Sequence, residues 1–148
     1  MKCRERHNPF TQLGKDLFAC HLYQAYLSIG SPPVAHTDGA QITPVGRDVS
    51  FIHNTIYSND GTSAIITPLA STGIVTNVLI KDNLLAGGAY TLYCQQSGSG
   101  NDYRVIGNHF STIFYPKVGA YGPWTDCEDE TEVSGNVYHE TGEPLTSF

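Results

Sequence analysis

The sequence predicts an all-β solenoid, in which the chain winds through successive turns made of short strands. Four stretches of one pattern recur along it: VSFIHNTI, VLIKDNLL, YRVIGNHF and TEVSGNVY. Each is centred on an asparagine, and these are Asn54, Asn83, Asn108 and Asn136. The positions three before and two after each asparagine are apolar, and the position five before is apolar in the first three copies. Apolar residues therefore alternate in the stretch before the asparagine, as in a strand with one buried face. Repetition every 25 to 29 residues indicates that one repeat is one turn of a solenoid.

We expect one domain over residues 1–148, with an irregular N-terminal cap over 1–14 and coils over 15–148. The coils are expected at about residues 15–46, 47–73, 74–100, 101–130 and 131–148, the last of them incomplete. The first is degenerate, because His21 takes the asparagine position there, with Phe18 and Tyr23 as its apolar neighbours. A helix over LGKDLFACHLYQAYLS is the main local alternative, since its apolar residues also recur near the helical period.

Within each coil, a strand ends at the asparagine, a short strand follows, and a glycine-containing turn leads to a third strand. The third strands are expected at GAQIT, SAIIT, AYTLYC and AYGPW. Aligning Thr43-Pro44 with Thr67-Pro68 assigns one parity of these strands to the core and the other to the surface. The expected inward residues are Ala40, Ile42, Ala64, Ile66, Tyr90 and Leu92. The expected outward residues are Gln41, Thr43, Ile65, Thr67, Thr91 and Tyr93.

Composition excludes several classes of function. A formal net charge of −6 argues against general nucleic-acid binding, which needs a basic surface. No stretch approaches the roughly 20 apolar residues of a membrane span. The four cysteines, Cys3, Cys20, Cys94 and Cys127, form no C-x-x-C pair, so zinc-knuckle spacing is absent. Buried free thiols and one or two disulfides both remain open.

The asparagine between two short strands resembles the asparagine ladder of right-handed parallel β-helices of the pectate-lyase superfamily. The stretch AHTDGAQI is similar to the H-x-D-G-x-Q segments of secreted members, and VSGNVYHETGEPL resembles their last coils. The similarity covers about residues 16–148 and implies a right-handed single-stranded parallel β-helix of about four to five coils. Stacked asparagine amides would then pair the backbone groups of buried turns. An extracellular location is also implied, although MKCRERHNPFTQLGKD lacks the apolar run of a signal peptide.

The resemblance implies a polysaccharide groove along the first sheet, which holds GAQIT, SAIIT and YTLYC. His36 and Asp38 beside it are the candidate catalytic acid and base. The alternative for Asp38 is a turn with Gly39, in which its carboxylate bonds its own backbone. Polygalacturonases of the superfamily carry a similar Asn-Thr-Asp-Gly segment, but their further Asp-Asp, Gly-His-Gly and Arg-x-Lys segments are absent here. The candidate substrate-binding residues are Gln41, Thr91, Tyr93 and Gln95.

Other charged residues are expected to be solvated. Lys81 and Arg104 point outward on the second sheet, away from the groove, and Arg47 stands alone. The acidic run TDCEDETE offers oxygen ligands of the kind that Ca²⁺ prefers, but it lacks the spacing of a calcium loop. We therefore expect no metal site, and Ca²⁺ is the one cofactor that the sequence leaves open.

Two functions from different classes fit the sequence. The first is binding or processing of a polysaccharide, by a lyase or hydrolase if the protein is an enzyme. The second is a structural module of a fibre, virion or extracellular assembly that self-associates through its solenoid. The short stack favours the second, because the two ends of a solenoid need covering.

Overall fold

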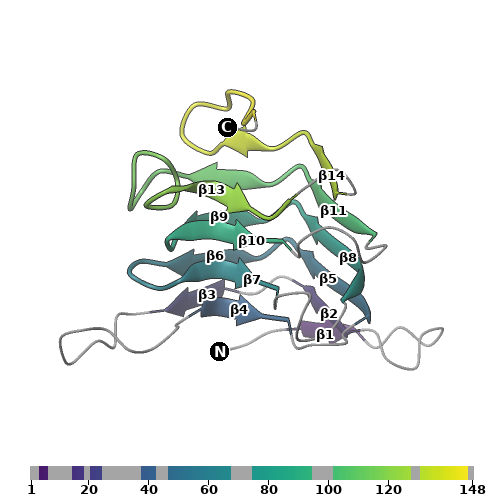
Figure 1. The fold of residues 1–148 in the computed structure, drawn as a ribbon. Coiled ribbons are helices and arrows are strands. Elements are labelled where there is room, and N and C mark those ends of the chain that lie inside the picture. Colours follow the sequence, from purple (N-terminus) through teal and green to yellow (C-terminus); the bar gives the residue numbers. More distant parts are fainter. Residues whose placement is uncertain are drawn as a thin grey trace.

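The computed structural model describes residues 4–6, 15–18, 21–24, 38–42, 47–67, 75–94, 102–127 and 131–146. In these ranges the chain forms strands and no helix, and the strands lie in three sheets stacked along one axis (Figure 1). The first sheet contains β4 (Asp38–Gln41), β7 (Ser63–Ile66), β10 (Tyr90–Tyr93) and β13 (Gly122–Thr125). The prediction of an all-β chain is confirmed.

The second sheet leads up to the asparagines and the third sheet follows them. The second contains β1 (Arg4–Arg6), β2 (Lys15–Phe18), β5 (Arg47–Ile52), β8 (Thr76–Lys81), β11 (Tyr103–Ile106) and β14 (Thr131–Ser134). The third contains β3 (His21–Gln24), β6 (Thr55–Ser58), β9 (Leu84–Gly87), β12 (His109–Ser111) and β15 (Val137–Tyr138). Neighbouring strands are parallel except that β1 is antiparallel to β2. Three parallel sheets of this kind fit a β-helix.

Apolar residues at matching repeat positions stack in rows, as the sequence pattern predicts. Three positions before each asparagine, one row of paired residues crosses the second sheet: Phe51, Ile80, Val105 and Val133. Two positions after, another row crosses the third sheet: Ile56, Leu85, Phe110 and Tyr138. Ile65 and Leu92 of the first sheet complete a core that draws on all three sheets.

Two expectations for the N-terminal region are wrong. The helix alternative fails because β2 and β3 are strands. His21 pairs with Thr55, the residue after Asn54, so it does not occupy the asparagine position. The register instead aligns Leu17 with Phe51 and Leu22 with Ile56. Within the cap expected to be irregular, Arg4–Arg6 forms β1, and the rest of 1–14 lies outside the described residues.

The parity expected for the first sheet is also wrong in part. Gln41 pairs with Ile66, and the backbone N–H of Ile42 donates to Ile66 O, so the Thr-Pro alignment is displaced by one residue. As a result Ile65 and Thr67 are buried and Ile66 is partly exposed. The Thr67 hydroxyl is satisfied inside by a hydrogen bond with the Tyr103 hydroxyl. Burial raises the pKa of Tyr103 well above its usual range, although this hydrogen bond lowers it slightly. Thr43 lies outside the described residues.

The four buried asparagines form a continuous column of hydrogen bonds, called the asparagine column below. The residues are Asn54, Asn83, Asn108 and Asn136. Each Oδ1 of the last three accepts from the backbone N–H and from Nδ2 of the asparagine before it, at 2.9–3.0 Å. Each Nδ2 of the last three also donates to the carbonyl of Phe51, Ile80 or Val105, at 2.8 Å. The column therefore pairs backbone groups that the turn would leave unsatisfied in the interior.

The residue before each asparagine has a left-handed backbone. The φ angles are 55° for His53, 54° for Asp82, and 64° for both Gly107 and Gly135. Glycine, aspartate and histidine are among the residue types that tolerate this region. The dipeptides HN, DN, GN and GN thus turn the chain sharply from the second sheet to the third.

A segment over residues 112–121 crosses the stack from the fourth repeat toward the second. The Tyr115 hydroxyl donates to Asn59 O at 3.0 Å, and the Phe114 ring contacts Tyr57 edge-on at 5.7 Å between centroids. Between these two repeats, the Gly87 N–H of the third repeat donates to Val118 O at 3.1 Å. This segment ties three repeats together along one side of the molecule.

The C-terminal residues fold back over the last repeat. Val137 bridges antiparallel to Pro144, and Leu145 is buried. The Glu140 carboxylate accepts hydrogen bonds from the Ser111 hydroxyl and from the Thr112 N–H, the latter at 3.1 Å. Partial burial alone would raise the pKa of Glu140, but these hydrogen bonds favour the charged form and the net pKa lies below its ordinary value.

Replacing Asn83 by alanine should destabilise the protein strongly. The substitution removes the acceptor of the buried Asn54 N–H and the donor to Phe51 O, and we expect a loss of about 2–4 kcal/mol in the free energy of unfolding. Urea unfolding measures it. The control is Asn59→Ala in a half-buried turn, for which we expect a change within about 0.5 kcal/mol. Equal effects of the two substitutions would contradict the role assigned to the column.

Glu140 should stabilise the protein at neutral pH more than at acidic pH. Because its pKa is lower in the folded state, its contribution is present above the unfolded pKa of about 4.3 and is lost as pH falls through the folded value. Glu140→Gln should therefore lower the melting temperature at pH 7, and the gap to the unsubstituted protein should close toward pH 3. Thermal scans at both pH values test this, and a gap independent of pH would refute it.

Candidate functional site

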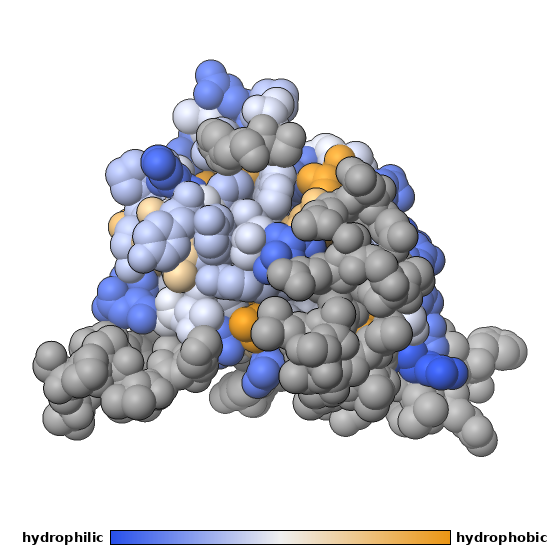
Figure 2. Space-filling model, in the orientation of Figure 1, coloured by the Kyte–Doolittle hydropathy of each residue, from blue (hydrophilic) through white to orange (hydrophobic). Residues whose placement is uncertain are grey.

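Three tyrosines gather at the outer face of the first sheet, and they are called the tyrosine cluster below. The Tyr90 ring meets Tyr93 edge-on at 5.7 Å between centroids, and it meets Tyr121 at 5.8 Å with a tilt of 50°. Tyr121 is 70% exposed, and the other two are partly exposed. Figure 2 shows that the face over this sheet carries mostly pale side chains of intermediate hydropathy rather than strongly charged ones.

The backbone holds the cluster firmly. Tyr90 and Tyr93 lie on β10, which is paired on both sides by β7 and β13. The Tyr121 N–H donates to Ala89 O at 2.8 Å, just before β13 begins. Gly122 pairs with Tyr90, and a Cβ there would lie 3.3 Å from the Tyr90 ring. The glycine therefore leaves room for the ring against the sheet.

Carboxylates lie close to the cluster. Burial raises the pKa of the Tyr93 hydroxyl, and the negative charges of Asp126 and Asp38 raise it further, while a backbone hydrogen bond at Tyr90 lowers it. Asp38 Oδ1 accepts a hydrogen bond from Ser63 Oγ at 2.7 Å. The face thus combines aromatic rings with hydrogen-bond acceptors and negative charge.

The structure brings together some of the residues predicted for this site. Asp38 and Gln41 lie on β4 and Tyr93 on β10, and Gln41, Ile66 and Tyr93 form one row across the sheet. Two strand spacings place Gln41 about 9.5 Å from Tyr93 along that row. Gln41 is exposed. Their predicted roles in chemistry and binding stay predictions, and His36 and Gln95 lie outside the described residues.

Thr91 does not reach this surface. It is fully buried, and its hydroxyl donates to Gly87 O at 2.8 Å. The expectation that it points outward is wrong because its hydroxyl closes the turn between β9 and β10. Sequence reasoning also missed Tyr90, which it placed inside, and Tyr121. The sequence signal was Gly122, directly after Tyr121, because it pairs with Tyr90 and leaves room for that ring.

Three of the described cations belong to strands of the second sheet. Lys81 and Arg104 belong to β8 and β11 of the second sheet, as predicted. Arg104 Nη2 donates to Asn77 Oδ1 at 2.7 Å, and Asn77 Nδ2 donates to Asp48 Oδ1 at the same distance. Arg47 opens β5. These side chains are held on another face.

Metal-binding groups are sparse in the part of the chain that the structure describes. It contains no group of three or more His, Cys, Asp or Glu side chains arranged to hold an ion. Asp126 and Glu132 of the acidic run are described, whereas Glu128, Asp129 and Glu130 are not. A calcium ion at this run stays a prediction.

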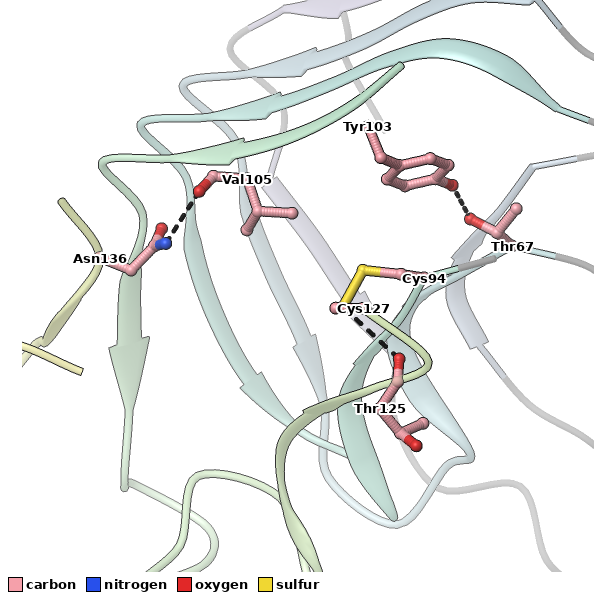
Figure 3. The surroundings of a disulfide bond; sticks show 7 residues. All are labelled: Thr67, Cys94, Tyr103, Val105, Thr125, Cys127 and Asn136. Carbon is pink, nitrogen blue, oxygen red and sulfur yellow. Dashed lines mark hydrogen bonds between the residues drawn. A yellow bond between two sulfur atoms is a disulfide. The ribbon is translucent and has the colours of Figure 1, made fainter. Parts of the chain in front are cut away.

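A disulfide joins Cys94, just after β10, to Cys127, just after β13 (Figure 3). It therefore joins β10, which carries Tyr90 and Tyr93, to β13, which begins just after Tyr121, at the end where Thr67 meets Tyr103. Cys127 lies close to Thr125, with its sulfur 3.5 Å from the Thr125 carbonyl oxygen. Of the two alternatives left open for these residues, the structure has the disulfide. Cys3 and Cys20 lie outside the described residues.

No protein-family model, curated protein or solved structure matches this chain. The described ranges contain no helix of the length and apolar character that a membrane crossing requires. The site must therefore be interpreted from its own chemistry.

Replacing both Cys94 and Cys127 by serine should destabilise the fold without abolishing the asparagine column. The bridge closes a sequence separation of 33 residues, so its loss should lower the free energy of unfolding by about 3–4 kcal/mol in the chain-entropy estimate. Urea unfolding of the double variant measures this. Non-reducing peptide mapping checks the bridge itself, and recovery of Cys94 as a free thiol would contradict it.

Proposed function

We propose that the protein is a short right-handed parallel β-helix of four to five coils, of the pectate-lyase type, and that it binds a neutral polysaccharide on its first sheet. The fold assignment is supported by the three parallel sheets and by the asparagine column, which has the contacts expected of an asparagine ladder. Its function rests on the tyrosine cluster.

Tyrosine suits sugar binding because each ring has an apolar face and a polar tip. The face packs against the C–H groups of a pyranose, and the hydroxyl exchanges hydrogen bonds with sugar hydroxyls. Tyr93 and Tyr121 flank Tyr90, and Gln41 in the row of Tyr93 adds an amide that donates and accepts. An extended sheet face can contact several sugar units in succession.

The charge of this face favours a neutral glycan over a polyuronate. Asp38 and Asp126 act on Tyr93 electrostatically, and they would repel uronate carboxylates. Lys81 and Arg104, whose charges could neutralise such a polymer, lie on the second sheet instead. The neutral class is therefore the better match.

An extracellular location fits the disulfide, because such bonds form and persist in oxidising compartments. Binding needs only the tyrosine cluster and Gln41, whereas most glycoside hydrolysis needs two carboxylates placed across the scissile bond. Asp38 supplies one candidate acid or base, with Ser63 as its hydrogen-bond donor. We therefore propose binding as the primary activity.

Alanine substitution in the tyrosine cluster should weaken glycan binding. We expect Tyr93→Ala and Tyr121→Ala each to cost about 0.5–1.5 kcal/mol, a rise in Kd of roughly two- to tenfold. Affinity electrophoresis and calorimetry against soluble neutral β-glucan, galactomannan and polygalacturonate provide the measurement. Ile113→Ala, which removes an exposed apolar side chain outside the cluster, should leave binding unchanged.

Other outcomes separate the alternatives. Product release that Asp38→Asn abolishes would extend binding to processing. Binding of polygalacturonate in preference to the neutral polymers would contradict the charge argument. Failure to bind any glycan, with a mass well above 16.1 kDa by light scattering, would favour the structural module instead. Stacking through the C-terminal end is disfavoured, because residues 139–146 already fold over it and bury Leu145.

A further inference from the structure

Two histidines meet on the outer face of the third sheet, away from the tyrosine cluster. His109 begins β12, and His139 follows β15 directly. Their Nδ1 atoms lie 3.3 Å apart, and their ring centroids lie 5.5 Å apart at an interplanar angle of 67°. Both rings are exposed, so neither is needed to fill the core.

The backbone fixes this arrangement. His109 pairs with Val137 across the two strands, and His139 stands two residues further along, on the same face. The Val137 N–H donates to Asn108 O at 3.0 Å, and the His139 N–H donates to Phe110 O at 2.9 Å. On the other side, the Tyr138 N–H donates to Glu143 O at 2.9 Å. The two imidazoles are therefore held next to each other by hydrogen bonds on either side.

The separation of the two nitrogens matches an edge of a metal coordination tetrahedron. Zinc binds imidazole nitrogen at about 2.0–2.1 Å with tetrahedral geometry, which places two ligand nitrogens about 3.3–3.4 Å apart. A square-planar ion with bonds of about 2.0 Å would bring neighbouring ligands to about 2.8 Å. The observed 3.3 Å fits the tetrahedral ion.

We propose that His109 and His139 bind a zinc ion through their Nδ1 atoms, with water in the two remaining positions. Without the ion, the two nitrogens share a hydrogen bond in which one donates and the other accepts. When zinc binds, the donating ring carries its proton on Nε2 instead, so that both Nδ1 atoms present a lone pair to the ion. The Glu140 carboxylate next in sequence is held by Ser111 and Thr112, so it is already engaged and is not counted as a ligand.

Calorimetry with zinc chloride on the full chain, freed of metal and carrying no histidine tag, tests this site. We expect the unsubstituted protein to bind one zinc ion that both His109→Ala and His139→Ala lose, each with affinity reduced at least about tenfold. The control is His53→Ala, an exposed histidine at the turn between β5 and β6, which should keep that ion. Zinc should also raise the melting temperature of the unsubstituted protein and of the control, and not that of the other two.

The variants are interpretable because the two rings are exposed and circular dichroism checks that the fold persists. Zinc binding that both alanine variants retain at full affinity would overturn the proposal, and so would zinc binding that only one of them lost. No zinc binding by the unsubstituted protein would overturn it as well. Glycan binding is measured on another face, so either proposal can fail without the other.

Discussion

The side-chain hydrogen bonds of the asparagine column are the interaction on which the remaining structure depends. At each turn from the second sheet to the third, Asn54, Asn83 and Asn108 donate a backbone N–H to the Oδ1 of the asparagine that follows. The asparagines at these turns are buried, and an unpaired amide there is costly. Each bond also fixes one repeat against the next, so the register of the sheets on both sides follows from it. The apolar rows of these two sheets and the histidine pair inherit that register.

Sequence reasoning was accurate where this column imposes the register and failed elsewhere. The rows through Phe51 and Ile56 are confirmed because they flank an asparagine that the sequence displays directly. The first sheet has no such marker. Its strands follow turns of unequal length, and a one-residue displacement of the Thr-Pro alignment reversed the side-chain directions of Ile65 and Ile66. A second one-residue error assigned His21 to the asparagine position, although it pairs with the residue after Asn54, because its repeat lacks an asparagine.

The candidate site shows the same division. Gln41 and Tyr93 could be assigned to the first sheet from strand periodicity, whereas Tyr121 arrives from a segment with no period. Thr91 was misplaced because its hydroxyl bonds the preceding turn, a local preference that alternation does not reveal. The histidine pair depends on a diagonal contact between two repeats, His109 and His139, which becomes visible only with the register known.

The segment over 112–121 changes how this stack should unfold. In solenoids whose repeats contact only their neighbours, stability is nearly a sum of local terms, and the ends fray independently of the middle. Here Tyr115 of the fourth repeat reaches Asn59 of the second, 56 residues earlier. Opening the fourth repeat must therefore release a contact in the second. The consequence is cooperativity: amide protons of these repeats should exchange as one unit, and a linear array is converted into a domain that folds as a whole.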